Sequence, residues 1–393
     1  MLINMDSDMN IEKFERNTKR NKSAYRMIYI ICISSVILYI FFYFRLLSKL
    51  KIIKRKNDKI INDLNQIINK LDKNQEKIDK NSTSNFLLNS QINRNEIFNE
   101  KLKKKIQENQ YYFCSSMDLF FDNEIENKIQ MAKAHYGNVS FDMYVFRGED
   151  FVSRSIIGSG SWEIEQFYKL LDGLDYYSKK KKLPKKEIIV LDIGANVGCY
   201  TFSLAKVGYE LISFEVSRMN SYLLKKTFCS NKDINVTLIN KGIGEEDEKC
   251  LLHHPSNNVG NGVILCGEQK NMVGNTKDLT EEVTFTKLSN YIPYLSKKNL
   301  ALIKIDVEGS EGKVIYSGIE LITKYHIPFL FIEFRNDYLK LKGTDPRQLL
   351  EMFVNNGYLL SLNGYFNKNY SSIDDILKSP STDLYIVYSK FLQ

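Results

Sequence analysis

The chain has 393 residues, which is enough for one sizeable domain with appendages. Its hydrophobic content of 43% and its charged content of 26% are those of an ordinary globular protein. The net charge of +8 belongs to residues 1–110, where 22 Lys and Arg outnumber 12 Asp and Glu. The rest of the chain lacks the positive charge typical of nucleic-acid-binding proteins, so we expect no nucleic-acid partner.

The chain begins with a basic tail at residues 1–26, followed by an apolar segment at residues 27–44. This segment holds 18 uncharged residues between Arg26 and Arg45, and as a helix it would span about 27 Å, close to the thickness of a hydrocarbon core. A cleaved signal peptide would need a shorter apolar core and a small-residue cleavage site, and a core helix would need a polar face. We therefore expect a retained, single-pass transmembrane helix.

The flanks of this segment do not set its orientation, because they carry six and seven Lys or Arg residues. The architecture favours a type II membrane protein, with a short cytosolic tail and a catalytic domain in the lumen of the Golgi or the endoplasmic reticulum. Acceptor triplets for N-glycosylation agree with this prediction and begin at Asn81, Asn138, Asn235 and Asn369.

Apolar residues recur at alternating steps of three and four along residues 45–80, which predicts a coiled-coil stem that joins copies of the chain into a homo-oligomer. Asn57 and Asn74 occupy two positions of the same seam. A single solvated helix and a disordered spacer remain the alternatives. The following residues, 81–110, are polar and predict a linker. The apolar seam consists of Leu46, Leu50, Ile53, Ile60, Leu64, Ile67, Leu71 and Ile78.

Residues 111–185 predict a cap region that helps to cover a cofactor. We expect a strand at residues 141–146 and an amphipathic helix at residues 162–177, with Trp162 in packing rather than in catalysis. The lysines at positions 179–182, 185 and 186 predict a solvated entry loop.

The six cysteines include no Cys-x-x-Cys pair, so we expect no structural zinc. Cys32 lies in the apolar segment and Cys199 in a glycine-rich turn. The other four, at positions 114, 229, 250 and 266, could pair in an oxidising lumen, and the sequence leaves that open. His253 and His254 are neighbours whose side chains diverge, so we expect loop histidines without a metal.

A strand–turn–helix unit opens the expected catalytic domain at residues 186–393. Residues 188–192 predict a buried strand ending at Asp192, after which Gly194 and Gly198 turn the chain into a helix at residues 200–206. A side chain at either glycine is expected to fill space that a nucleoside-containing ligand needs. The Gly-x-x-x-Gly spacing lacks the pyrophosphate cradle of dinucleotide-binding proteins and favours S-adenosylmethionine.

Acidic residues close the next predicted strands as well. Glu215 follows strand 210–214 and lies 23 residues after Asp192, where an acid can accept the ribose hydroxyls. Asp306 ends strand 300–305 and precedes a helix that reaches about residue 321, and Glu333 lies near the end of strand 328–334. Because ligands bind at the carboxyl edge of open α/β sheets, we expect these acids to share one site.

The segments Asp192–Gly198, Phe214–Glu215, Lys304–Glu311 and Ile332–Glu333 resemble the FkbM-type methyltransferases, over roughly residues 186–390. The resemblance implies a Rossmann-like α/β class I methyltransferase fold, whose seven-stranded sheet is mostly parallel with an antiparallel last strand. It also implies that S-adenosylmethionine is the cofactor, with its ribose on Glu215 and its adenine near residues 235–242. Its methionyl part would be held by Asp192, Gly194, Asn196 and Gly198.

A sulfonium methyl group is already activated, so the protein must align the reactants, exclude water and assist proton removal from the acceptor. Asp306 is the first candidate for the catalytic carboxylate, followed by Glu308 and Glu333, and their spacing does not single out a metal site. We expect a hydroxyl acceptor on a glycan or on another small or lipid-linked molecule. An inactive membrane-anchored scaffold and a nucleotide-dependent oxidoreductase are the alternatives.

Overall fold

The computed structural model describes Cys114 and residues 123–147, 150–254, 263–267, 279–367, 369–380 and 383–393. The chain divides into two units, residues 1–99 and residues 100–393, and every described residue lies in the second unit. The predicted tail, transmembrane helix, stem and linker, at residues 1–26, 27–44, 45–80 and 81–110, lie outside the described residues. Among the helices that are described, none combines the length and the apolar character that crossing a membrane requires.

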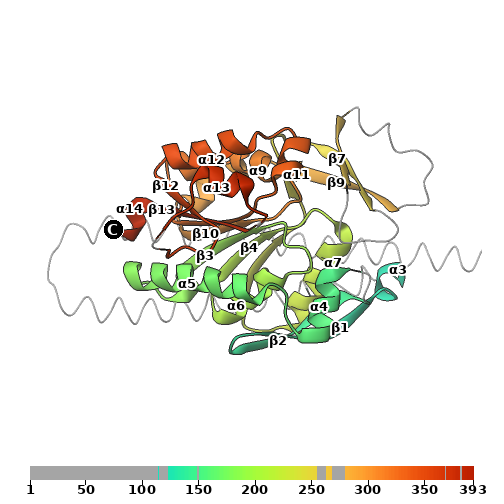
Figure 1. Ribbon diagram of the computed structural model, residues 1–393. Helices are drawn as coiled ribbons and strands as arrows, with labels where there is room; N and C mark the ends of the chain where they lie inside the picture. The colour runs from blue at the N-terminus through green and yellow to red at the C-terminus, as the bar shows by residue number, and fades with distance from the viewer. Residues whose placement is uncertain are drawn as a thin grey trace, which may run out of the picture. The chain divides into compact units, whose positions relative to one another are not determined.

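A seven-stranded sheet forms the centre of the second unit, in the order β12-β13-β11-β10-β3-β4-β5 (Figure 1). Neighbouring strands from β11 to β5 are parallel, whereas β13 is antiparallel to both of its neighbours. All six residues of β3 are buried, because helices cover both faces. The predicted sheet with an antiparallel last strand is confirmed. Its strands are β3 (Ile188–Ile193), β4 (Glu210–Phe214), β5 (Asn235–Ile239), β10 (Asn299–Ile305), β11 (Phe329–Glu333), β12 (Tyr358–Ser361) and β13 (Asp383–Tyr388).

Each face of this sheet has its own apolar core. A hairpin of β1 (Ile129–Tyr136) and β2 (Val139–Phe146) shares one core with three helices, α5 (Ile164–Lys181), α6 (Cys199–Val207) and α7 (Arg218–Ser230). The other core is shared by α9 (Glu311–Ser317), α10 (Glu320–Thr323), α12 (Pro346–Asn355) and α13 (Ile373–Lys378), which lie across the sheet from α5 and α6 (Figure 1).

A smaller four-stranded sheet follows β5 in the chain, in the order β6-β9-β7-β8. Four cysteines of the described residues form the disulfides Cys114–Cys229 and Cys250–Cys266. A fifth, Cys199, is buried and free. The second disulfide joins β7 to the end of β8. The small sheet consists of β6 (Gly242–Ile243), β7 (Lys249–His254), β8 (Val263–Leu265) and β9 (Leu279–Thr286), and the remaining short helices are α3 (Asn123–Glu126), α4 (Phe151–Ser159), η2 (Lys185–Glu187), η4 (Leu288–Tyr291), α8 (Ile292–Leu295), α11 (Asn336–Leu341) and α14 (Ser389–Leu392).

Three local predictions were wrong. The helix expected through residue 321 breaks at Gly318, where a Cβ would lie 2.6 Å from Leu288, so the close approach of η4 ends α9. The lysines at 179–181 form the last turn of α5 rather than a loop, which suits the negative end of the helix dipole. His253 and His254 belong to β7 rather than to a loop, because they pair with Thr280 and Leu279 of β9.

Candidate active site

A cavity of about 500 Å³ opens at the carboxyl ends of the parallel strands. Open α/β sheets bind their ligands at this edge. The cavity brings together most of the residues predicted for the site: Gly194, Asn196, Glu215, Asp306, Glu308 and Glu333. Asp192 and Gly198 do not line it. They lie behind its wall, so their roles differ from the predicted contact with a cofactor.

The glycine turn is required by the packing of the protein itself. Gly194 has φ +81°, and a Cβ there would lie 1.8 Å from the backbone oxygen of Asp306. At Gly198, φ is +99° and a Cβ would lie 2.6 Å from Leu224 and Phe202. The prediction that side chains here would fill ligand space was therefore wrong. The missing Cβ atoms let β3 and β10 end side by side and let α6 pack against α7.

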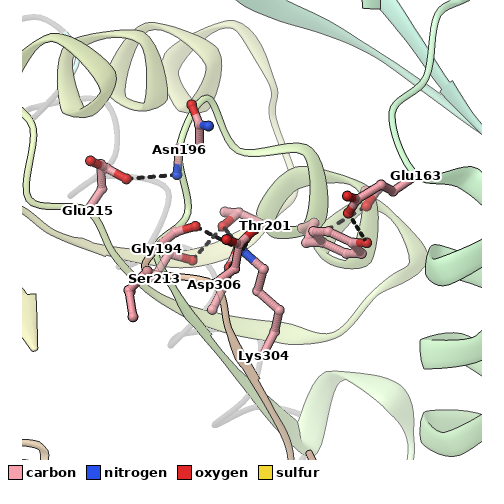
Figure 2. A network of polar contacts seen from close by, with 12 residues as sticks. Glu163, Gly194, Asn196, Thr201, Ser213, Glu215, Lys304 and Asp306 are labelled. Atoms are coloured by element: carbon pink, nitrogen blue, oxygen red, sulfur yellow. Dashed lines mark hydrogen bonds and ion pairs between the residues drawn. The ribbon is translucent and has the colours of Figure 1, made fainter. Parts of the chain in front are cut away.

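Glu215 is buried at the end of β4 and is bound to the glycine turn (Figure 2). The Asn196 amide donates to its Oε2 and the Ser217 amide to its Oε1, both at 2.8 Å. Burial raises the pKa of Glu215 to about 7, against the opposing effect of these hydrogen bonds. The carboxylate thus faces the cavity from a fixed position, where its free lone pairs can accept hydroxyl hydrogens.

Two asparagine side chains beside Glu215 each carry an amide oxygen that can accept a hydrogen bond from a ligand. Asn196 and Asn220 both line the cavity, and Asn220 is only 4% exposed. Neither amide Oδ1 has a hydrogen-bond partner among the described residues. Because unsatisfied buried polar atoms are costly, this end of the cavity fits a polar ligand that donates hydrogen bonds, as ribose hydroxyls and amines do.

Lys304 holds the centre of the site and carried no role in the sequence prediction. Its Nζ donates to the backbone oxygen of Gly194 at 2.9 Å and lies 3.5 Å from Asp192 Oδ1 and 3.3 Å from Asp306 Oδ2. Burial opposes its charge, but Asp306 and Asp192 raise the pKa of Lys304 above its usual range. The sequence did contain a sign of this role, because Lys304 lies within an otherwise apolar strand. A cation buried in such a strand requires a carboxylate partner.

Asp192 is a partner of Lys304 rather than a ligand of the cavity. It is 1% exposed and pairs with Lys304 across the register of β3 and β10. Its Oδ2 accepts a hydrogen bond from the hydroxyl of Thr201 at 2.6 Å, at the start of α6. The chain from Thr201 through Asp192 and Lys304 to Gly194 fixes the turn from beneath (Figure 2).

The opposite end of the cavity is acidic. Glu333 and Glu308 approach Asp306, and burial, followed by the charges of Asp306 and Glu308, raises the pKa of Glu333 to about 8. Burial and Asp306 also raise the pKa of Glu308. Glu311, which the sequence prediction left without a role, lies behind them and accepts hydrogen bonds from the Val307 and Gly309 amides.

The predicted cap region supplies one wall of the cavity through Phe151, Val152, Trp162 and Glu163. Glu163 was missed in the sequence, since nothing local marks it. It lies across the site from Glu215 (Figure 2) and accepts a hydrogen bond from the hydroxyl of Tyr200 at 2.7 Å. Burial raises the pKa of this carboxyl, and the charge of Asp306 raises it further.

Backbone strain concentrates at this cavity. Six non-glycine residues in the described ranges have a positive φ, and three of them line the cavity: Glu163 at +49°, Asn196 at +51° and Glu308 at +53°. Such conformations cost about 1–3 kcal/mol each and persist where the surrounding structure holds them for a function. The strain marks the same site as the charges do.

The carboxylates of the cavity do not converge on one point. Within the described chain, the one group of three potential metal ligands whose ligand atoms lie within 4.8 Å of each other is Glu248, Cys250 and Cys266. Two of these are the cysteines of a disulfide on the small sheet. Among the described residues, the acids at the carboxyl edge therefore form no group of three ligand atoms this close together.

Comparison with solved structures gives likenesses at low sequence identity. The chain is similar to monomeric WbdD at 14% sequence identity, over 60% of this chain and 44% of that chain, with a TM-score of 0.36. It is similar to magnesium protoporphyrin IX methyltransferase from Synechocystis PCC 6803 at 12% sequence identity, over 60% of this chain and 89% of that chain, with a TM-score of 0.28. It is also similar to the 16S rRNA methyltransferase RsmC of T. Thermophilus at 12% sequence identity, over 66% of this chain and 50% of that chain, with a TM-score of 0.30. The chain spans less than half the length of the WbdD chain.

No curated protein matches the chain. A family model described as "Methyltransferase FkbM domain" matches residues 192–360. That range begins at Asp192, at the base of the glycine turn, and includes both Glu215 and the acids from Asp306 to Glu333. The part of the chain that forms most of the cavity therefore matches a methyltransferase domain of the FkbM type.

Proposed function

We propose that the protein is an S-adenosylmethionine-dependent O-methyltransferase that acts on a hydroxyl of a glycan or of another small or lipid-linked acceptor. One observation carries the proposal: a single cavity joins a buried strand-end carboxylate on a glycine turn to a group of desolvated acids. The first arrangement suits a nucleoside-containing donor, and the second suits an acceptor that must lose a proton. The match of residues 192–360 to a methyltransferase domain supports the same reaction class.

The residues around Glu215 fit the donor. Its carboxylate can accept the two ribose hydroxyls, and the unpaired amide oxygens of Asn196 and Asn220 can accept further hydrogens. Lys304 and Asp192 keep the turn in place from below. When bound, S-adenosylmethionine supplies a methyl group whose bond to sulfur breaks as the acceptor oxygen bonds to its carbon, with the electron pair left on sulfur.

Glu333 is our first choice for the base, followed by Glu308 and by Asp306, the residue favoured from sequence. Asp306 already forms an ion pair with Lys304, with 3.3 Å between its Oδ2 and the lysine Nζ. Glu333 Oε2 has no hydrogen-bond partner among the described residues and lines the same cavity. A carboxylate with a pKa of about 8 can take the hydroxyl proton near neutral pH far better than an ordinary one.

Replacing Glu215 with glutamine is expected to weaken donor binding by about 10- to 100-fold, the loss typical of a charged hydrogen bond. Glutamine keeps one acceptor oxygen, and its NH₂ would face an amide that already donates to this position. Equilibrium dialysis of the full-length chain with labelled S-adenosylmethionine measures the effect. Glu351→Gln, on the exposed side of α12, is the matched control. Undiminished binding by Glu215→Gln would contradict the proposed donor site, and a lack of donor binding by the unchanged chain would favour an inactive scaffold.

The rate of methyl transfer is expected to rise about tenfold per pH unit below pH 8 and to level off above it. The reason is that Glu333 must be deprotonated to act as a base, and its raised pKa keeps the proton bound at lower pH. Glu333→Gln should lower the rate by about 10²- to 10⁴-fold and remove this rising limb. A pH–rate profile of the variant that keeps the wild-type shape would exclude Glu333 as the base.

We also propose that the enzyme is anchored as a single-pass type II membrane protein with residues 100–393 in an oxidising lumen, and that the stem at residues 45–80 forms a homo-oligomer. Two disulfides support the lumenal side, since they persist where thiols are not kept reduced. Asn138 is exposed in the turn between β1 and β2, where an acceptor triplet is accessible. Glycosidase treatment of the expressed chain should increase its gel mobility, and Asn138→Gln should reduce that shift. A chain without glycans would argue for the opposite orientation.

A further inference from the structure

The lining of the whole cavity has a strong charge imbalance. Six carboxylates line the cavity, against three cations. Two of the three cations, Lys304 and Arg335, lie with the acids of β10 and β11, and the third, Lys241, follows β5 at the donor end. The acids are Asp150, Glu163, Glu215, Asp306, Glu308 and Glu333.

Both cations at the acceptor end are already engaged. Lys304 is 3% exposed, donates a hydrogen bond to the Gly194 oxygen and forms ion pairs with Asp192 and Asp306. The Arg335 guanidinium lies 3.2 Å from Asp337 Oδ2 and stacks at 3.5 Å over the ring of Tyr338. A phosphate, a sulfate or a carboxylate on an acceptor would have to compete with these carboxylates for a cation that replaces its water.

The acids of this end act as one group. Burial raises the pKa of Glu163, Glu308 and Glu333, and the charge of Asp306 raises it further, so all three carboxyls lie within electrostatic reach of Asp306. Asp150 adds a carboxylate that is 4% exposed and lines the same cavity. Its Oδ2 has no hydrogen-bond partner in the described ranges, so the wall offers a further acceptor to a ligand.

An apolar platform borders these acceptors. Phe151 lines the cavity with 67% of its surface exposed, and the Arg154 guanidinium lies 4.5 Å from its ring centroid. Trp162 lines the same wall. Aromatic surface beside groups that only accept hydrogen bonds is suited to a molecule with an apolar face and several hydroxyl donors, which describes a sugar ring.

We infer that the acceptor is an uncharged polyhydroxyl group, a neutral sugar, and that the carboxylates around Asp306 exclude phosphorylated, sulfated and carboxylated sugars. The inference rests on the proposed methyltransferase function. Neutral hydroxyls donate to the carboxylates, whereas an anionic acceptor meets like charges, and the two described cations at this end, Lys304 and Arg335, already pair with carboxylates. The site therefore distinguishes neutral from anionic acceptors by repelling the anions as much as by binding the neutral hydroxyls.

The experiment uses the purified full-length chain, S-adenosylmethionine labelled in its methyl group, and a polar extract of the expressing cells divided by anion exchange into a neutral and an acidic pool. Mild alkali removes methyl esters, so that the remaining label reports methyl ethers. We expect the neutral pool to take up at least tenfold more label per mole of sugar. Glu308→Gln should lower the neutral-to-acidic ratio at least threefold, and Glu351→Gln should leave it unchanged.

The outcomes of these experiments distinguish a failure of the proposed function from a failure of the neutral-sugar inference. If the full-length chain does not bind the donor in equilibrium dialysis, the proposed function is wrong and this inference falls with it. If the donor binds and the label enters the acidic pool equally, or enters neither pool, the neutral-sugar acceptor is overturned while the donor site stands. Donor binding by Glu308→Gln shows that the variant is folded, so an unchanged ratio in that variant counts against the carboxylates as the cause.

Discussion

Gly194→Ala is expected to lower the free energy of unfolding of the domain by about 3 kcal/mol or more. Two effects add at this position. The added Cβ would lie 1.8 Å from the Asp306 backbone oxygen, which belongs to a central strand end and has little room to move. A φ of +81° also strains any residue with a side chain. Chemical denaturation of the wild type and the variant measures the difference.

Gly343→Ala is the matched control for Gly194→Ala. Gly343 has a similar φ of +86°, but a Cβ there meets nothing within 4 Å. It should therefore cost only the backbone term, about 1–2 kcal/mol. If both variants lose the same stability, the contact between the glycine turn and β10 is not the reason for glycine at position 194.

Lys304→Met is expected to lower the free energy of unfolding by about 3–5 kcal/mol, because it leaves the Asp192 charge buried without its partner. Methionine fills a similar volume but cannot donate to the Gly194 oxygen, so donor affinity should fall as well. Denaturation and equilibrium dialysis measure the two losses on the same samples.

Two further variants test whether the unpaired Asp192 carboxylate causes the loss of stability in Lys304→Met. Lys304→Met combined with Asp192→Asn should recover part of the stability, because the buried charge is then gone. Lys249→Met removes an equally charged side chain from an exposed ion pair with Glu282 and should leave the free energy of unfolding nearly unchanged. If the double variant is no more stable than Lys304→Met, the loss has a source other than the unpaired carboxylate.

Local patterns were sufficient for the central sheet. The strands predicted at residues 188–192, 210–214, 300–305 and 328–334 each appear in the sequence as a short apolar run that ends at or near an acid. These features depend on neighbours a few residues apart. The helix expected through residue 321 was wrong for the opposite reason, since its break at Gly318 depends on the distant Leu288.

The roles within the site were harder to predict. Strand-end acids were correctly expected to gather at one edge, because parallel strands place their carboxyl ends together. Which of them face the cavity depends on the register between strands. That register pairs Asp192 with Lys304 and removes it from the cavity, and it sets Gly194 against Asp306.

The sequence by itself determined several strands, the glycine turn and the set of strand-end acids, because these follow from short-range periodicity and spacing, whereas the antiparallel last strand was implied by the resemblance to the FkbM-type methyltransferases. The tertiary structure alone decided the cysteine pairs, the engagement of Lys304, the entry of Glu163 from the cap region and the glycine contacts. Each of these joins residues that are distant in the chain, and burial then sets their charges. A carboxylate becomes a base or a buried partner according to its neighbours in space, which spacing along the chain does not specify.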